Sequence, residues 1–389
     1  MFSKNIVFKN FKNKINKNQN KKINNLLKKE LIYSSLLLNS LTGKYKYSFK
    51  KKNLKKFKNY KCYNLIGMGG STLGTEAIYD FLKHKIKKKF KFYNNLQSQN
   101  IFKSKSKKVN LIISKSGNTL ETITNFNLIL KNQKSNKNII ITENKDSFLN
   151  LLAKKLKAEI FEHKNYIGGR YSVLSEVGML PAELMGLNER KFKRFNYLIK
   201  NKVFKNLLVS NVNFIFKSII KGNKNSVILN YDEKSENLFK WYQQLTAESL
   251  GKKSKGFFPI ISSMPKDNHS LLQLYLDGPK NNFFTFFYTK EKKSEKLRNS
   301  DLFNQFSILK TKNISEIINS QKKATENIFR RKKIPFRSIE ILNRNEESLG
   351  ELFCFFILET ILLGRLLKVN PFDQPSVELI KTETRKILK

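Results

Sequence analysis

NLIISKSGNTLET, residues 110–122, joins a short apolar run to a loop rich in hydroxyl groups. Residues 111–113 are branched and apolar and predict a buried strand. Gly117 predicts a sharp turn, and we expect a helix to open near Thr119. A strand that passes through a tight turn into a helix is suited to bind an anion, because the first amides of a helix have no partner within the helix.

The side chains of this loop add to that expectation. Ser114, Ser116 and Thr119 offer hydroxyl donors, and Lys115 offers a positive charge, so these four residues are candidate phosphate ligands. The stretch by itself leaves an alternative open, in which it is only a turn followed by a capped helix.

A second glycine loop lies upstream, in NLIGMGGSTLGTEAIYDFL (residues 64–82), and predicts a strand, a turn and a helix. It is similar to the opening of a dinucleotide-binding fold, but Thr72 stands where the third glycine belongs, and the following KKKFKFYNN has no acid for a ribose. A nicotinamide cofactor is therefore not expected. The loop places backbone amides and Ser71 at a helix N-terminus, which suits a second phosphate-facing edge.

Strands alternate with helices along the rest of the chain, which predicts α/β architecture with two doubly wound parallel sheets and a ligand in the cleft at their strand ends. We expect helical N- and C-terminal extensions at 1–50 and 371–389, and two α/β subdomains at 51–200 and 201–370. Further strands are expected at 138–143, 158–163, 226–231, 257–263, 282–288 and 338–341, and helices at 119–132, 145–156, 236–252, 268–277 and 346–368.

The composition is that of a globular protein with an unusual charge. The 389 residues are 40% apolar and carry a formal net charge of +46. Such a charge is compatible with nucleic acid, a membrane surface or an anionic substrate. However, the lysines are spread over the whole chain, arginines are few, and no zinc-ligand spacing or aromatic RNA-binding motif is present. We attribute the charge to coding bias and expect no specific nucleic-acid partner, only salt-sensitive binding to polyanions.

Cellular location can also be predicted. Cys62 and Cys354 lie in apolar surroundings far apart in the chain, as expected of free thiols in a reducing compartment. The N-terminus has no signal-peptide pattern, and the apolar stretch 352–364 is too short and too polar to span a bilayer. We therefore expect a cytoplasmic protein without membrane association. We also expect no metal, because no ligand cluster is recognisable.

Three further residues provide an anion binder, a carboxylate and an imidazole. Arg170 follows two glycines in a loop, Glu248 lies near the end of an apolar helix, and His269 is one of three histidines. Taken singly, each of them has an ordinary structural explanation.

Together with their surroundings they resemble a known family. GMGGSTLG, SKSGNTLET, YIGGRYS, AESLGK, NHSLLQL and NPFDQPSVELIK are similar, in order and approximate spacing, to segments of glucose-6-phosphate isomerases, especially the compact bacterial type. The resemblance covers about residues 64–381. It implies two sugar-phosphate-binding subdomains of the SIS type and reversible isomerisation of glucose 6-phosphate and fructose 6-phosphate.

The resemblance also implies roles for individual residues. Glu248 would move the proton between C1 and C2, Arg170 would face the enediolate, and His269 and Lys381 would open the sugar ring. Gln374 would join Ser71, Ser114, Lys115, Ser116 and Thr119 at the phosphate. The family further implies no cofactor and a homodimer with shared active sites, in which His269 reaches the site of the neighbouring subunit.

Elementary chemistry is consistent with these roles. Aldose–ketose exchange needs one base and a fixed cation beside the developing enediolate. Gln374 and Lys381 are seven positions apart, so both can face one cleft if this segment is helical. Ser376 and Leu250 depart from the residues usual in the family, and neither is a catalytic position.

Two other functions remain open from the sequence. One is a sugar-phosphate sensor that keeps the phosphate loop without catalysis, and the other is a nucleic-acid binder, which rests on charge alone. Within the isomerase hypothesis, activity on mannose 6-phosphate is a further possibility.

Overall fold

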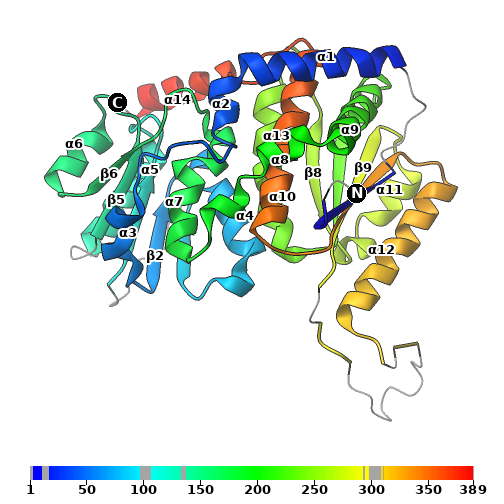
Figure 1. Cartoon of the computed structure of the whole chain (residues 1–389), viewed down its shortest axis with the longest axis horizontal. Helices are drawn as coiled ribbons and strands as arrows, with labels where there is room; N and C mark the ends of the chain where they lie inside the picture. Colours follow the sequence, from blue (N-terminus) through cyan, green and yellow to red (C-terminus); the bar gives the residue numbers. More distant parts are fainter. Residues whose placement is uncertain are drawn as a thin grey trace.

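Two five-stranded β-sheets stand side by side, each with helices packed on its faces (Figure 1). The computed structural model describes residues 3–10, 17–96, 107–132, 137–291, 294–297, 308–309 and 311–388. This arrangement confirms the predicted α/β fold with two parallel sheets.

The first sheet is parallel throughout. In spatial order its strands are β3 (Lys89–Tyr93), β2 (Cys62–Ile66), β4 (Val109–Ile113), β5 (Lys137–Thr142) and β6 (Glu159–Glu162). Its helices are α4 (Leu73–Phe81), α5 (Leu120–Asn132), α6 (Phe148–Lys155) and α7 (Glu176–Met185). Every residue of β4 is buried, as expected for the central strand of a covered parallel sheet.

The second sheet has one antiparallel edge. Its spatial order is β1 (Ile6–Lys9), β10 (Phe336–Ile341), β9 (Asn282–Thr289), β7 (Asn225–Asn230) and β8 (Phe258–Ser263). Its helices are α9 (Lys202–Ile220), α10 (Glu236–Leu250), α11 (Leu272–Asp277), α12 (Ile314–Arg331) and α13 (Glu346–Leu366).

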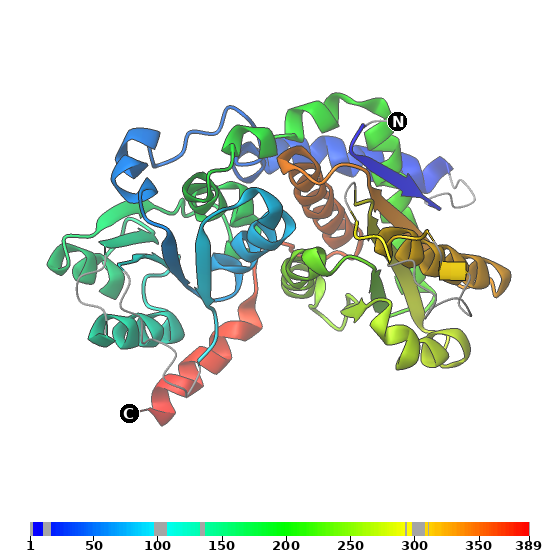
Figure 2. The same ribbon diagram turned by 90° about the horizontal axis from the view of Figure 1, so that it is seen from below.

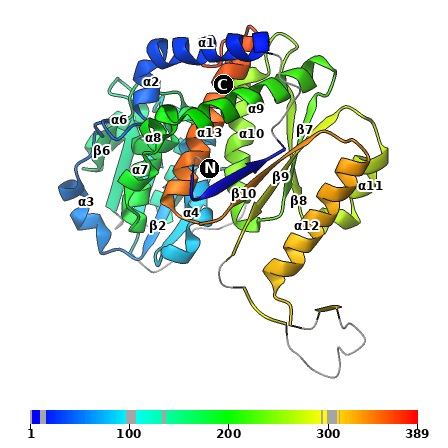
Figure 3. The ribbon, with the colours of Figure 1, turned by 45° about the vertical axis from the view of Figure 1, so that its right-hand side comes forward.

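The N-terminal segment differs from the purely helical extension that the sequence predicts. It contains α1 (Lys17–Tyr33) and α2 (Ser35–Asn39), but β1 pairs antiparallel with β10 at the sheet edge (Figure 3). The prediction missed β1 because four residues between polar neighbours are too few to establish a period. The division of the chain at 50, 200 and 370 remains a proposal.

The helix α13 forms the centre of the molecule. Its residues from Ser348 to Gly364 are all buried, and it packs against α10, α9 and α1. A capping box at Asn345 satisfies the first amides of this helix. α10 packs against α13 and also against α4, which belongs to the first sheet. It is therefore held at the junction of the two sheets.

A charged cluster lies in the core beside α13. Arg337 and Glu359 form an ion pair with no exposed side-chain surface, and the Tyr242 hydroxyl donates to Glu359 Oε1 at 2.7 Å. Arg337 Nη1 also donates to Asn211 Oδ1 at 2.5 Å. The cluster links β10, α13, α9 and α10, so it fixes the rotation of α10 about its axis.

Two helices stand out by their surroundings. α9 is long and apolar enough to cross a membrane, but half of that stretch is buried here, as in core helices of other proteins. α14 (Pro375–Ile387) has no buried residue, and Figure 2 shows it running away from the junction of the two sheets to the C-terminus. Two further short helices are α3 (Lys51–Lys58) and α8 (Phe195–Lys200).

Candidate active site

Two backbone segments meet where the sheets adjoin. They are the short 3₁₀ helices η1 (Gly69–Ser71), after β2, and η3 (Gly169–Leu174), after β6. A Cβ atom added at Gly70 would lie only 2.2 Å from the carbonyl carbon of Gly169, so a side chain cannot be accommodated at this crossing. The glycine at position 70 thus allows η3 to approach η1 closely and to place Arg170 where the two sheets adjoin.

Arg170 is the central cation of the site, with a side chain that is only 1% exposed. Its Nη1 donates to Glu248 Oε2 at 3.0 Å and to Gln374 Oε1 at 2.6 Å. The structure therefore brings together three of the predicted site residues, which come from η3, α10 and the N-cap of α14. An arginine with these partners can stabilise an oxyanion that forms beside a carboxylate.

Glu248 lies in the last turn of α10, with a side chain that is 28% exposed. Its second oxygen, Oε1, accepts a hydrogen bond from Gln244 Nε2 at 2.8 Å. The carboxylate is thus oriented from both sides yet retains access to solvent, which a base that exchanges protons with substrate requires. Gln244 was missed in the sequence, although its position one helical turn before Glu248 could have indicated it.

The hydroxyl loop lies at the carboxyl end of β4. Gly117 has a φ of +70°, which makes the predicted turn. Ser114 Oγ lies 2.8 Å from Thr119 Oγ1, and Ser116 Oγ lies 3.4 Å from the same atom. Three predicted phosphate ligands therefore converge just before α5, whose first amides have no helical partner. Ser71 ends η1 after β2, the neighbour of β4 in the sheet, so both loops lie at one edge.

The side chain of Lys115 does not hydrogen-bond to the three hydroxyl groups, but contacts other residues. Its Nζ donates to the Asn165 carbonyl at 2.7 Å and lies 3.6 Å from Glu143 Oε1. Burial lowers the pKa of its ammonium group. Lys115 also lines a cavity of about 430 Å³ together with Tyr33, Tyr166 and Phe372.

Two predicted residues are not joined to the others in this single chain. His269 is exposed at the end of η6 (Lys266–His269), and no hydrogen bond of its ring is found within the described ranges. Lys381 lies half exposed on α14, where its Nζ donates to Glu378 Oε1 at 2.6 Å. The segment of Gln374 and Lys381 is helical from Pro375, as expected.

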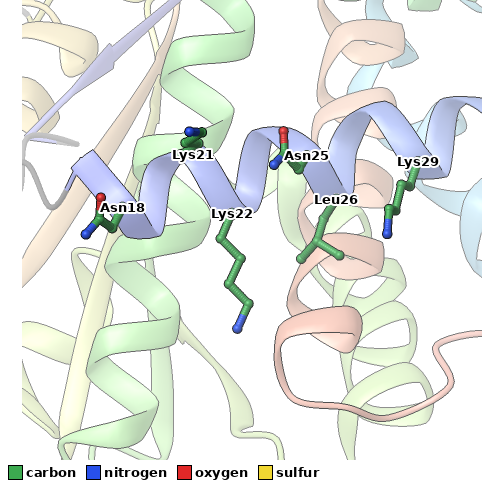
Figure 4. A pocket seen from close by; sticks show the side chains of 6 residues that line it. All are labelled: Asn18, Lys21, Lys22, Asn25, Leu26 and Lys29. Atoms are coloured by element: carbon green, nitrogen blue, oxygen red, sulfur yellow. The ribbon is translucent and has the colours of Figure 1, made fainter.

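A groove along α1 offers a contrasting surface. It has a volume of about 490 Å³ and is lined by Asn18, Lys21, Lys22, Asn25, Leu26 and Lys29. Figure 4 shows Lys22, Leu26 and Lys29 pointing to the same side of the helix. The groove has cations but no carboxylate or imidazole for proton transfer, so the Arg170 site is the better candidate. In the part of the chain that the structure describes, no group of three or more His, Cys, Asp or Glu residues is arranged to hold a metal ion.

Solved structures share this architecture. A hypothetical protein from Thermus thermophilus superposes with a TM-score of 0.83 at 22% identity, covering 95% of this chain and 94% of its own. A glucose-6-phosphate isomerase from Chlamydia trachomatis gives a TM-score of 0.70 at 18% identity, covering 87% of this chain and 72% of its own. The fold is thus one that a sugar-phosphate isomerase shares.

Sequence comparison narrows the class to one family. Residues 48–389 match the phosphoglucose isomerase family. A glucose-6-phosphate isomerase of Methanocaldococcus jannaschii is 34% identical over 87% of each chain, and that of Campylobacter jejuni is 30% identical over 83% of this chain and 84% of its own. The chain belongs to the phosphoglucose isomerase family.

Proposed function

We propose that this protein interconverts glucose 6-phosphate and fructose 6-phosphate, as a reversible step of glycolysis and gluconeogenesis. Family membership supports the reaction, and the observation that carries it is the contact of Arg170 Nη1 with Glu248 Oε2 at 3.0 Å. This contact pairs the base required for proton transfer with the cation required beside the developing charge.

In the proposed reaction the substrate phosphate occupies the hydroxyl edge formed by Ser71, Ser114, Ser116 and Thr119. Lys115 and Gln374 assist there. Lys115 Nζ donates to the Asn165 carbonyl in this structure, and an ammonium group has three N–H donors, so Lys115 can also donate to a phosphate.

Proton transfer follows ring opening by His269 and Lys381. Glu248 removes the proton from C2 of the open-chain aldose and returns it to C1, while Arg170 stabilises the enediolate between the two steps. Only protein groups are used, so we propose that neither a metal nor a cofactor takes part.

We further propose a cytoplasmic homodimer with shared sites. His269 is exposed just beyond the end of β8, the edge strand of its sheet; Phe258 at the start of that strand is 72% exposed, and Leu274 of the following helix is 51% exposed. An imidazole beside an exposed apolar edge is well placed to enter the cleft of a second copy that covers this edge. Within the described residues, no feature favours the alternative of a non-catalytic sensor, which needs only the phosphate loop.

The test is a direct assay. Purified protein is mixed with fructose 6-phosphate in the presence of EDTA, and glucose 6-phosphate is measured as it forms. We expect turnover. A folded sample without turnover would reject the enzymatic function, and activity that requires an added metal after EDTA treatment would reject the metal-free mechanism.

A further inference from the structure

We infer that Ser249 and Tyr171 are positioning residues. They keep the Arg170 guanidinium oriented toward Glu248 and Gln374, through a closed ring of hydrogen bonds with the carbonyl of Pro371. The inference rests on the proposed function, because it concerns how the cation of that site is kept in place. The side chains of Ser249 and Tyr171 are both fully buried, and Tyr171 also lines the cavity that Lys115 borders.

The ring is defined by four contacts. Arg170 Nε donates to Ser249 Oγ at 2.8 Å, and Ser249 Oγ lies 3.0 Å from Tyr171 Oη. Tyr171 Oη donates to the Pro371 carbonyl at 2.9 Å, and that carbonyl also accepts from Arg170 Nη2 at 2.7 Å.

The chemistry of these groups fixes the direction of every bond. A carbonyl oxygen only accepts, so the single Tyr171 proton goes to Pro371. The Ser249 proton must then go to Tyr171, which leaves a Ser249 lone pair for the Arg170 N–H. Burial raises the pKa of the Tyr171 hydroxyl above its usual value near 10, so the hydroxyl keeps its proton and remains a donor at neutral pH.

The ring explains how the donors of Arg170 are divided. A guanidinium has five N–H groups in one plane. Nε and Nη2 are bound to the protein frame, at Ser249, at Pro371 and at the Asp373 carbonyl, which lies 3.0 Å from Nη2. Both N–H groups of Nη1 face Glu248 and Gln374. Because the guanidinium is planar, the hydrogen bonds of Nε and Nη2 determine where the two N–H groups of Nη1 point.

The same ring ties the C-terminal segment to the site. Pro371 and Asp373 lie between α13 and α14, and both accept hydrogen bonds from Arg170 Nη2. The hydroxyls of Ser249 and Tyr171 thus help to place Gln374 as well as the guanidinium.

The test removes each hydroxyl while retaining the rest of the side chain. In Tyr171→Phe and Ser249→Ala we expect kcat to fall by about tenfold with KM for fructose 6-phosphate nearly unchanged, because the cation acts mainly on the transition state. Since one ring serves one arginine, the double variant should lose about the same tenfold and not about a hundredfold.

Ligand binding separates positioning from general damage. 5-Phosphoarabinonate carries a carboxylate where the enediolate would be, whereas sorbitol 6-phosphate has no charge there. Calorimetry should show that Tyr171→Phe and Ser249→Ala bind 5-phosphoarabinonate about tenfold more weakly than the wild type does, and that they bind sorbitol 6-phosphate with unchanged affinity. The control pair is Tyr231→Phe and Thr325→Val, which removes another buried hydroxyl contact, of 3.1 Å, in the core of the second sheet. It should leave kcat unchanged.

Three results would overturn the inference. They are single variants with wild-type kcat, losses that multiply in the double variant, and equal weakening of both ligands. An inactive wild type would reject the proposed function together with this inference, whereas an active wild type with unaffected variants would reject the inference alone.

Discussion

Arg170 and Glu248 form an ion pair of 3.0 Å in which the guanidinium is almost fully buried and the carboxylate is partly exposed. The cation is therefore fixed within the protein, while the carboxylate can reach a substrate. The variants below test this division of roles and the structural features that support it.

Glu248→Gln keeps the shape of the side chain and removes the base. We expect kcat to fall by at least ~10²-fold while sugar phosphates still bind. Exchange of the substrate C2 hydrogen with solvent measures the proton-transfer step itself. Glu236→Gln is the matched control, because Glu236 is on the same helix, is 46% exposed and pairs with Lys240. Normal C2 exchange in Glu248→Gln would place the base elsewhere.

Replacing Ser114 and Thr119 with Ala should raise KM far more than it lowers kcat. The phosphate is held equally in the ground state and in the transition state, so its ligands contribute uniform binding. Steady-state kinetics with fructose 6-phosphate measure the change. Ser218→Ala removes a buried hydroxyl from α9 and should leave KM unaltered. If KM also stays constant in the Ser114 and Thr119 variant, residues 114–119 form only a turn.

Mixed dimers can test whether His269 acts in the neighbouring subunit. Glu248→Gln and His269→Ala chains are each expected to be nearly inactive. After they are unfolded, mixed and refolded together, half of the dimers are hybrid, and each hybrid has one intact site. Activity should recover to roughly a quarter of the wild-type value. Hybrid dimers with no more activity than the parent variants would show that His269 serves its own chain.

Glu359→Leu should destabilise the protein by about 3–5 kcal/mol, because Arg337 is left as a buried charge without its partner. Urea unfolding followed by circular dichroism measures the loss. The double variant Arg337→Met/Glu359→Leu removes both charges and should regain most of the stability. A double variant that is less stable than Glu359→Leu would show that Arg337 contributes through its other partners, Asn211 and Thr285.

His163 predicts a stability that depends on pH. The ring is buried, its Nδ1 lies 3.1 Å from the Lys164 carbonyl, and burial lowers its pKa to about 4. The unfolded chain binds this proton at a pKa near 6.5, so the stabilisation is present above that value and is lost as the pH falls toward 4. The loss amounts to about 3 kcal/mol.

Urea unfolding across this pH range measures the effect. His163→Asn should flatten the slope, whereas His269→Gln, which replaces an exposed ring, should retain it. An unchanged slope in His163→Asn would assign the acid sensitivity to other groups.

Much of the fold could be predicted because its strands are short apolar runs between helices. The segment 110–122 became β4, a turn and α5 as expected, since a local period and one glycine determine all three. β3 was missed although the first four residues of KFKFY alternate, because its lysines resembled those of the surrounding loops. β1 depends on pairing with β10, more than 300 residues away, which no local pattern reveals.

The site could be predicted in part. Spacing and hydroxyl content indicated Ser114, Ser116 and Thr119, whereas the meeting of Arg170 with Glu248 was expected only from a family resemblance. The groups that hold Arg170 could not be predicted, because two of the three acceptors of Nε and Nη2 are the backbone carbonyls of Pro371 and Asp373. A carbonyl is present at every residue, so only the path of the folded chain shows which ones are used.

The full occupation of the Arg170 donors has a consequence for substrate entry. Both N–H groups of Nη1 are engaged before any substrate arrives, by Glu248 and by Gln374. A substrate oxygen can bind this guanidinium only by exchange, in which it displaces one of these two resident acceptors. When the displaced acceptor is Glu248, its carboxylate loses its ion-pair partner and is then free to accept a proton.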